Sequence, residues 1–369
     1  MEEGLQHATG TGSSYRRPTP IFVGPAGCFS PQPGCPVPPS LTMQPGAAPA
    51  PPARKGARTG RESTDPQGQV RRPAAGDAAG PLRRVRGHRE LQRQARALAA
   101  KGAEVVHTDS DDADSLAGAL DGAYGAFFVT SFWEHFSPER ELQQARNMAH
   151  AAARAGVRHA IWSTLEDSRQ HVPLDDDRVP TLMGRYKVPH FDAKGEADGA
   201  FRESGVATTL LRTSFYWDNF IHFGMEPKRG EDGVLALTMP MGDKRLAGIA
   251  ADDIGACAFG IFKAGPELTG QYVGIAGGHL TGAEMAAAIG RALGEEVRYQ
   301  DVPVDVFRSL GFPGADDLGN MFQYYQDFEA HFSASRPVDK ARQLHPGLQD
   351  FDTWVQRNAA RIPVAQPAA

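Results

Sequence analysis

The sequence predicts an α/β protein with a doubly wound parallel sheet and a smaller α+β region toward the C-terminus. From residue 91 onward, short apolar strands alternate with helices of about ten to fifteen residues, as in the strand–helix–strand units of parallel sheets. Residues 126–130 form a continuous apolar run, which is typical of a parallel strand buried on both faces. Right-handed crossovers between such strands place helices on both faces of the sheet.

Local signals define the individual elements in chain order. Strands are expected at residues 103–108, 126–130, 159–163, 208–212, 272–275 and 297–300. Helices are expected at residues 92–102, 111–120, 138–156, 191–203 and 281–293, with a polar loop at 167–183. The clearest helix begins with Ser137 as its N-cap and Pro138 at its first position, and Gly156 ends it. Thr281 and Glu284 form a capping box for the last helix.

Composition divides the chain into two parts. Of its 28 prolines, 15 precede Leu82, and the first 100 residues carry 14 Lys and Arg against 6 Asp and Glu. This first part is therefore basic, although the whole chain has a net charge of −5. Residues 1–90 are poor in large apolar side chains that could offset their ordering entropy, so we expect them to be disordered. The folded domain is expected at residues 91–360, with a substrate-side region near 220–350.

Composition also argues against several kinds of function. The arginines of the basic segment lie among Gly, Pro and Ala without aromatic residues beside them, so we expect no nucleic-acid binding. Cys28, Cys35 and Cys257 match neither a metal-binding spacing nor a disulfide framework, which favours a reducing compartment and no metal. We expect no membrane span, because an apolar run of about 18 residues is missing. With no apolar signal region at the start, a cytoplasmic protein is expected.

Polar and aromatic side chains follow four of the expected strands. In an open parallel sheet, ligands bind beyond the carboxyl ends of the strands. The residues at these ends are Asp109 and Ser110, then Thr130, Ser131 and Phe132, then Ser163 and Thr164, and finally residues 213–219. Each has a structural alternative, such as a helix cap at Asp109 or a core position at Trp217. Their shared location nevertheless predicts a single cleft.

Four segments and one acidic residue resemble a known family. The segments are AFFVTSFWE (126–134), HFDAKGE (190–196), FYWDN (215–219) and LGFPGADDLGNMF (310–322). Together with Asp109 they resemble the NmrA-like family, atypical members of the short-chain dehydrogenase/reductase group. The resemblance extends from about residue 96 to about residue 355.

The resemblance implies a Rossmann-type fold that binds NADP. Some members of the family are redox sensors without turnover, and others reduce quinone-like substrates. The implied cofactor contacts are Asp109 and Ser110 beside the adenine, Thr130, Ser131 and Phe132 along the path to the nicotinamide, Lys194 at the ribose, and Tyr216, Trp217, Asp218 and Asn219 closing that end.

His190 and Lys194 lie on one helix face, because they are spaced i, i+4. In short-chain dehydrogenases a tyrosine holds the first of these positions, and the lysine binds the nicotinamide ribose and lowers the tyrosine pKa for proton transfer. Here the tyrosine is replaced by His190. Lys194 keeps the cofactor role, and in an enzyme His190 or Ser163 would assist protonation. A surface lysine without a role is the structural alternative.

The N-terminal part departs from the family. The family opens with a strand and a G-x-x-G-x-x-G loop whose backbone approaches the pyrophosphate. The nearest candidate here is residues 21–27, IFVGPAG, where Pro25 removes an amide donor and further prolines follow. The first strand–helix–strand unit is therefore expected to be missing or replaced. That loss would leave an unpaired edge on the strand at 126–130. An out-of-frame reading of GC-rich DNA before residue 96 is one explanation of this composition.

Three functional hypotheses follow from the sequence. The first two are an NADP(H)-binding reductase of a small carbonyl or quinone, and a dinucleotide sensor that regulates a protein partner. The third is a scaffold without cofactor binding that acts through protein–protein contacts. A homodimer is compatible with each of them.

Overall fold

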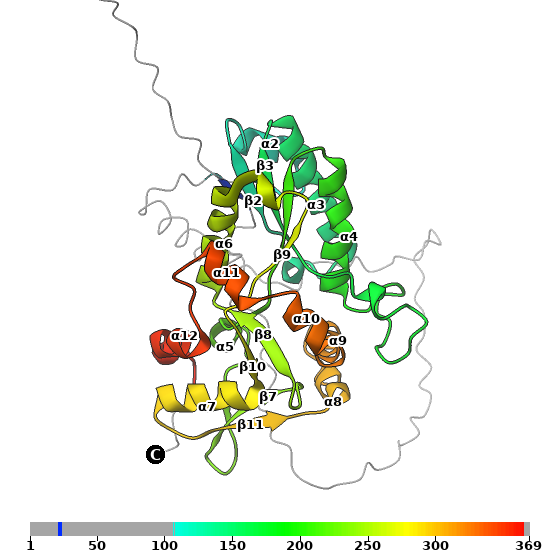
Figure 1. The fold of residues 1–369 in the computed structure, drawn as a ribbon. Helices are drawn as coiled ribbons and strands as arrows, with labels where there is room; N and C mark the ends of the chain where they lie inside the picture. Colours follow the sequence, from blue (N-terminus) through cyan, green and yellow to red (C-terminus); the bar gives the residue numbers. More distant parts are fainter. Residues whose placement is uncertain (1–20, 24–105, 107, 365–369) are drawn as a thin grey trace, which may run out of the picture.

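The computed structural model describes residues 21–23, 106 and 108–364 (Figure 1). The disorder expected for residues 1–90 and the helix expected at 92–102 lie outside the described residues, apart from Ile21–Val23. The same holds for the expected strand at 103–108, except for Val106 and Thr108, which belong to no strand.

The central sheet has five described strands, all parallel, in the order β1-β2-β3-β4-β9. Their bounds are β1 (Ile21–Val23), β2 (Gly125–Phe128), β3 (His159–Thr164), β4 (Thr208–Arg212) and β9 (Tyr272–Gly274). The order and the common direction confirm the predicted parallel α/β sheet.

Strand β1 occupies a place that the sequence left open. It pairs in parallel with Ala126–Phe128 of β2, so that this edge of β2 has a partner. In the strand order 3-2-1-4-5-6, this is the place of the first strand. The expectation of an unpaired edge on this strand was therefore wrong. Gly24 and Gly27 of the glycine-loop candidate lie outside the described residues.

Alternate strand residues point to opposite faces of the sheet, so the buried strands place apolar side chains on both faces. Helices cover each of these faces. Ala126 and Phe128 of β2 pack in the cluster beneath α2 (Ala113–Ala119), α3 (Pro138–Arg154) and α4 (Pro189–Glu203). Phe127 faces the other side, where α6 (Ala251–Ala264) and α11 (Val338–Leu344) complete the cluster. The strand is buried throughout, as its apolar sequence predicts.

The capping signals have the predicted effect. Ser137 Oγ accepts a hydrogen bond from the Arg140 amide at 3.2 Å, and Pro138 is the first residue of α3. Both halves of the Thr281–Glu284 capping box are formed at the start of α7 (Gly282–Leu293). Helix α4 begins two residues earlier than predicted, because Pro189 takes its first position.

The remaining elements form a second region beyond the carboxyl ends of the central strands (Figure 1). One small sheet consists of β5 (Phe215–Tyr216), β8 (Arg245–Ile249) and β10 (Gly278–Thr281). The other consists of β6 (Lys228–Arg229), β7 (Leu235–Met239) and β11 (Val297–Asp301). The helices here are α5 (Asn219–His222), α7, α8 (Val304–Arg308), α9 (Ala315–Asp327), α10 (Glu329–Ala334) and α12 (Phe351–Asn358). Short 3₁₀ helices lie at η1 (Phe132–Glu134), η2 (Ser168–Gln170), η3 (Gly265–Leu268) and η4 (Ala359–Arg361).

An aromatic core holds this second region together. Trp217 packs against Phe351 and Trp354, with ring centroids 5.2 and 6.2 Å away. Gly248 lies directly beside the indole of Trp217, where a Cβ atom would be 2.2 Å from Nε1. Among the described helices, none combines the length and the apolar character that a membrane crossing requires.

Candidate functional site

Lys194 reaches from helix α4 to the carboxyl end of strand β2. Its Nζ donates a hydrogen bond to Thr130 Oγ1 at 2.7 Å and lies 2.8 Å from Glu141 Oε1. The Thr130 hydroxyl in turn donates to Glu141 Oε1 at 2.6 Å. Two of the predicted site residues, Thr130 and Lys194, are thus joined by a third that the sequence did not single out.

Glu141 is a carboxylate inside the protein, with its side chain fully buried on α3. Burial alone would raise its pKa, but the ammonium of Lys194, the His135 imidazole 3.5 Å away, and hydrogen bonds from Lys194 and Thr130 outweigh this and lower the pKa to about 2. The group is therefore charged at neutral pH and pairs with Lys194. Its place on the same helix face as Ala145 and Met148 was the available signal, because a charged residue there needs a buried partner.

His190 lies in an aromatic setting at the start of α4. Its ring centroid is 4.8 Å from that of Trp133 and 6.0 Å from that of Phe132. Its Nδ1 lies 2.6 Å from Oδ1 of Asp317, a buried residue of α9, and the His190 amide donates to Oδ2 of the same carboxylate at 3.2 Å. The predicted residues Phe132 and His190 are therefore brought together, and Asp317 joins them from the second region.

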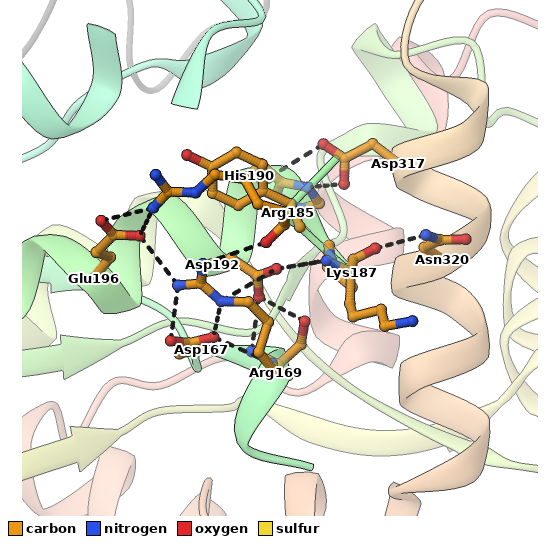
Figure 2. A network of polar contacts seen from close by, with 12 residues as sticks. Asp167, Arg169, Arg185, Lys187, His190, Asp192, Glu196, Asp317 and Asn320 are labelled. Atoms are coloured by element: carbon orange, nitrogen blue, oxygen red, sulfur yellow. Dashed lines mark hydrogen bonds and ion pairs between the residues drawn. The ribbon is translucent and has the colours of Figure 1, made fainter. Parts of the chain in front are cut away.

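Asp192 ties the beginning of α4 to the loop after β3 (Figure 2). Its buried carboxylate accepts from the Ser168 amide and hydroxyl at 2.8 and 2.5 Å, and from the Lys187 amide at 2.8 Å. Burial raises the pKa of Asp192, and these donors counteract the shift. The contacts fix the backbone that carries His190 and Lys194.

Two arginines fasten the same loop to the outer face of α4. Arg169 pairs with Asp167 at 2.7 Å and with Glu196 at 3.1 Å, and Arg185 pairs with Glu196 at 2.8 Å (Figure 2). Both guanidinium groups lie over the ring of Tyr186. The first residues of the polar loop predicted at 167–183 thus form the short helix η2, and ion pairs attach them to α4.

Ser163 lies at the carboxyl end of β3, as predicted, with its side chain buried. Its neighbour Thr164 donates to Asp198 of α4 at 2.6 Å and to the Lys194 carbonyl at 3.2 Å. Burial raises the pKa of Asp198 to about 6, against hydrogen bonds from Thr164 and Tyr272. These contacts attach the middle of α4 to β3, whereas no hydrogen bond links Ser163 to His190 or Lys194 within the described part of the chain.

Asp109 and Ser110 immediately precede α2 and lie beside α3, and no hydrogen bond or ion pair among the described residues joins them to Lys194. The exposed Asp109 carboxylate accepts from the Asp111 amide at 2.9 Å, and the Ser110 carbonyl accepts from Asn147 at 3.0 Å. Asp111 completes the attachment through an ion pair with Arg140. Their contact with an adenine stays a prediction.

The segment 216–219 links the two regions. Tyr216 shares a hydrogen bond with Thr213 at 3.2 Å, and Trp217 is 1% exposed in the aromatic core. Asp218 accepts from the Ala251 amide at 2.8 Å, at the N-terminus of α6, and burial raises its pKa. Asn219 begins α5. The indole of Trp217 takes the core position named as its structural alternative, and a cofactor contact of this segment stays a prediction. Ser131 precedes η1 as its N-cap.

A parallel sheet covered on both faces, with buried polar clusters at its carboxyl ends and a second region beyond them, defines a Rossmann-like α/β protein. A model of the NmrA-like family matches residues 84–355, and the chain belongs to this family. The match begins earlier than residue 96, where the resemblance was placed from the sequence.

Several curated relatives have names that include a redox activity. The chain is 26% identical over 274 residues to the NmrA-like family domain-containing oxidoreductase FrzB of Cladobotryum sp., covering 68% of this chain and 78% of that protein. It is 29% identical to the NAD(P)H azoreductase of Xenophilus azovorans, with coverages of 62% and 74%. It is also 29% identical to quinone oxidoreductase 2 of Escherichia coli, with coverages of 62% and 72%.

Solved structures share the fold. The negative transcriptional regulator NmrA in complex with NAD superposes with a TM-score of 0.58 at 21% identity, covering 71% of this chain and 82% of that one. The triphenylmethane reductase of Citrobacter sp. complexed with NADP(H) gives a TM-score of 0.55 at 20% identity, with coverages of 73% and 87%. At these identities the likeness concerns the fold.

Proposed function

We propose that this protein is an NAD(P)H-dependent reductase of a small carbonyl compound or quinone. The proposal rests on the arrangement of Lys194 and His190 on helix α4. Helix α4 presents Lys194 at the end of β2 and, one turn earlier, a histidine whose ring is held between Asp317 and the aromatic residues of η1. The first group suits a cofactor hydroxyl, and the second suits proton transfer. Relatives named as oxidoreductases support this assignment.

The residues at the end of β2 fit the ribose of a dinucleotide. The Lys194 side chain is 12% exposed, and its ammonium is held by Glu141 and Thr130. The three donors of the ammonium are directed at Thr130 Oγ1, at Glu141 Oε1 and, at 3.3 Å, at the Thr130 carbonyl. A ribose hydroxyl would therefore take the place of the carbonyl, which is the longest of the three contacts. When bound, the reduced dinucleotide supplies a hydride from its nicotinamide ring. A preference for NADP over NAD is a proposal from the family resemblance.

His190 supplies the proton in this scheme. Its Nδ1 faces Asp317, which leaves Nε2 as the ring nitrogen for a substrate oxygen. General-acid catalysis of this kind contributes about 10²–10⁴-fold to a rate. Ser163 is the second candidate for a proton donor, since its hydroxyl lies at the end of the neighbouring strand β3.

Stopped-flow oxidation of NADPH against a panel of quinones and small carbonyl compounds tests the proposal. We expect turnover with at least one acceptor, a loss of about 10²-fold or more in kcat for His190→Gln, and no change for the exposed control His150→Gln. Oxidation of NADPH at the same rate in His190→Gln as in the wild type would rule out His190 as the proton donor.

A dinucleotide sensor is the second candidate function. It is favoured by the histidine at the position where short-chain dehydrogenases have tyrosine, because a sensor needs the cofactor contact of Lys194 without a proton donor. The same stopped-flow experiment separates the two functions. A sensor binds NADPH and leaves every acceptor unreduced.

A further inference from the structure

Asp317 contacts His190 twice from an element that is far away in sequence. Oδ1 lies 2.6 Å from His190 Nδ1, and Oδ2 accepts the His190 amide at 3.2 Å across 127 residues of sequence separation. Asp317 is 3% exposed and His190 is 6% exposed, so solvent competes little for these contacts. Figure 2 shows the carboxylate of Asp317 directed from α9 at the imidazole.

The shorter contact determines where the ring carries its hydrogen. An ionised carboxylate only accepts hydrogen bonds, so the nitrogen that faces it must be the one that donates. Nδ1 of His190 therefore carries the hydrogen, and Nε2 is left for another partner. No hydrogen bond to Nε2 is formed by any residue in the described ranges, and this nitrogen is available to a substrate.

The longer contact has a structural explanation. The amide of His190 belongs to the first turn of α4, where backbone amides lack acceptors within the helix. The Asp317 carboxylate accepts from this amide, and its negative charge is stabilised by the positive end of the helix dipole. Capping of the helix requires only one oxygen of Asp317, and it does not require a histidine side chain at position 190. It leaves the second oxygen, at 2.6 Å from the imidazole, without an explanation.

Helix α9 presents a row of polar side chains to the segment that leads into α4. Asn320 Nδ2 donates to the carbonyls of Lys187 and Pro180 at 2.5 and 2.8 Å. Gln323 donates to the Arg178 carbonyl at 2.8 Å, and Tyr324 shares a hydrogen bond with His171 at 2.7 Å. Asp317 and Asn320 are spaced i, i+3, so one face of α9 holds both His190 and the chain just before it (Figure 2).

We propose that Asp317 is the positioning residue of His190: it selects the Nδ1–H tautomer and aims Nε2 at the substrate oxygen. This inference rests on the proposed reductase function. It assigns a role to the segment LGFPGADDLGNMF, which the sequence marked as family-like without a function. Helix α9 of the second region thereby completes a site whose other residues come from the central domain.

The proton and electron balance is that of a carbonyl reduction. A bound reduced nicotinamide would supply a hydride, so that its own C–H bond would break and it would be oxidised while the carbonyl is reduced. The carbonyl carbon would gain the C–H bond, and the C=O π electrons would move to oxygen. Oxygen takes the proton from Nε2 of the imidazolium, which becomes the neutral Nδ1–H imidazole. Water returns the proton. Asp317 stays ionised throughout and balances the imidazolium charge.

The test combines ring-nitrogen NMR with kinetics on the full chain. In protein labelled with ¹⁵N-histidine, the His190 signals are assigned by their loss in His190→Gln. We expect the wild type to show a hydrogen-bearing Nδ1 and a bare Nε2 when the ring is neutral. In Asp317→Asn we expect the bare nitrogen to become Nδ1, and kcat to fall by about 10²-fold or more with a small change in KM.

Two further variants separate positioning from a general loss of structure. Asp316→Asn changes the exposed neighbour, whose carboxylate accepts the Asp317 amide at 2.9 Å and does not contact His190. Asn320→Ala removes a contact of the same α9 face with the loop. Both should keep the wild-type tautomer, and Asp316→Asn should keep the wild-type kcat.

Three results would overturn the inference. They are a bare Nδ1 in the wild type, an unchanged tautomer in folded Asp317→Asn, and the same tautomer change in Asp316→Asn. The wild-type spectrum decides the first even if Asp317→Asn does not fold. The NMR experiment does not require turnover, so the two proposals are tested separately. An inactive wild type would contradict the proposed reductase function, whereas the spectra would still show whether Asp317 selects the tautomer of His190.

Discussion

For single residues, the candidate site depends on two buried carboxylates, each of which holds one functional side chain. Lys194 is held by a carboxylate with no exposure to solvent, and His190 by another that is nearly buried. Removing one partner of the Lys194–Glu141 ion pair leaves an uncompensated buried charge, which costs about 3–5 kcal/mol. Glu141 and Asp317 therefore fix the positions of Lys194 and His190 in the folded protein.

Glu141→Gln tests the first pair. The folded-state pKa of about 2 lies below the ordinary value of 4.5, so the ionised form stabilises the fold above pH 4.5 and this contribution is lost as the pH falls through 2. The shift corresponds to about 3 kcal/mol. We expect Glu141→Gln to lower the free energy of unfolding by about that amount at pH 7, and by progressively less below pH 4.5, as measured by urea denaturation.

Glu203→Gln is the matched control for this prediction, because Glu203 is an exposed residue at the end of α4. It should leave the free energy of unfolding within about 0.5 kcal/mol of the wild type. A difference between Glu141→Gln and the wild type that stays constant from pH 7 to pH 3 would contradict the buried charge pair.

The sequence predicted one half of each pair and missed the other. Lys194 and His190 were found because they share a helix face and a family motif. Glu141 lies on the buried face of α3, but that position does not identify the residue with which it pairs. Asp317 was missed because local periodicity carries no information on a contact across 127 residues. For Trp217 the pattern could not distinguish a cleft from a core, since a large aromatic residue after a strand suits both.

At the scale of elements, helix α4 is the part that assembles the site. It contacts the segment just after β2 through Lys194, β3 through Asp198, and α9 through His190. Gly195 permits its close approach to the loop after β3, because a Cβ atom there would lie 2.6 Å from the backbone nitrogen of Asp167. The helix and its caps were predictable from sequence, whereas this close approach was not.

A pair of glycine substitutions on α4 tests the close approach. Gly195→Ala must displace backbone, so we expect it to lower the free energy of unfolding by about 1–3 kcal/mol and to weaken NADPH binding. Gly199→Ala is the control, since the nearest atom to its Cβ would be 3.9 Å away. In a helix interior it should raise the free energy of unfolding by about 0.5–1 kcal/mol. Equal effects of both substitutions in urea denaturation would contradict this role of Gly195.

For the molecule as a whole, two regions contribute to the candidate site. The central sheet supplies its strand ends, and the second region supplies Asp317. The parallel sheet was predictable, because buried strands alternate with well-capped helices. The pairing of Ile21–Val23 with β2 was not, because a three-residue apolar run among prolines and glycines has too little local signal to identify its partner strand.

The family match and the composition of the first part bear on the cofactor in opposite ways. The matched residues 84–355 include Lys194 and His190, the groups proposed for the ribose and the proton. The residues that follow Val23 replace the expected glycine loop with a proline-rich sequence. Dinucleotide binding by the full chain is therefore the central claim of the proposed function.

Isothermal titration of NADPH into the full 369-residue chain tests this claim most directly. We predict saturable binding with one site per chain, weakened by about tenfold or more in Lys194→Ala, since a charge-assisted hydrogen bond is worth about 1.5–3 kcal/mol. The half-buried control Lys244→Ala, outside the candidate site, should bind as the wild type does. The absence of heat from NADPH binding to the folded wild-type chain, or equal affinity in Lys194→Ala, would contradict the account.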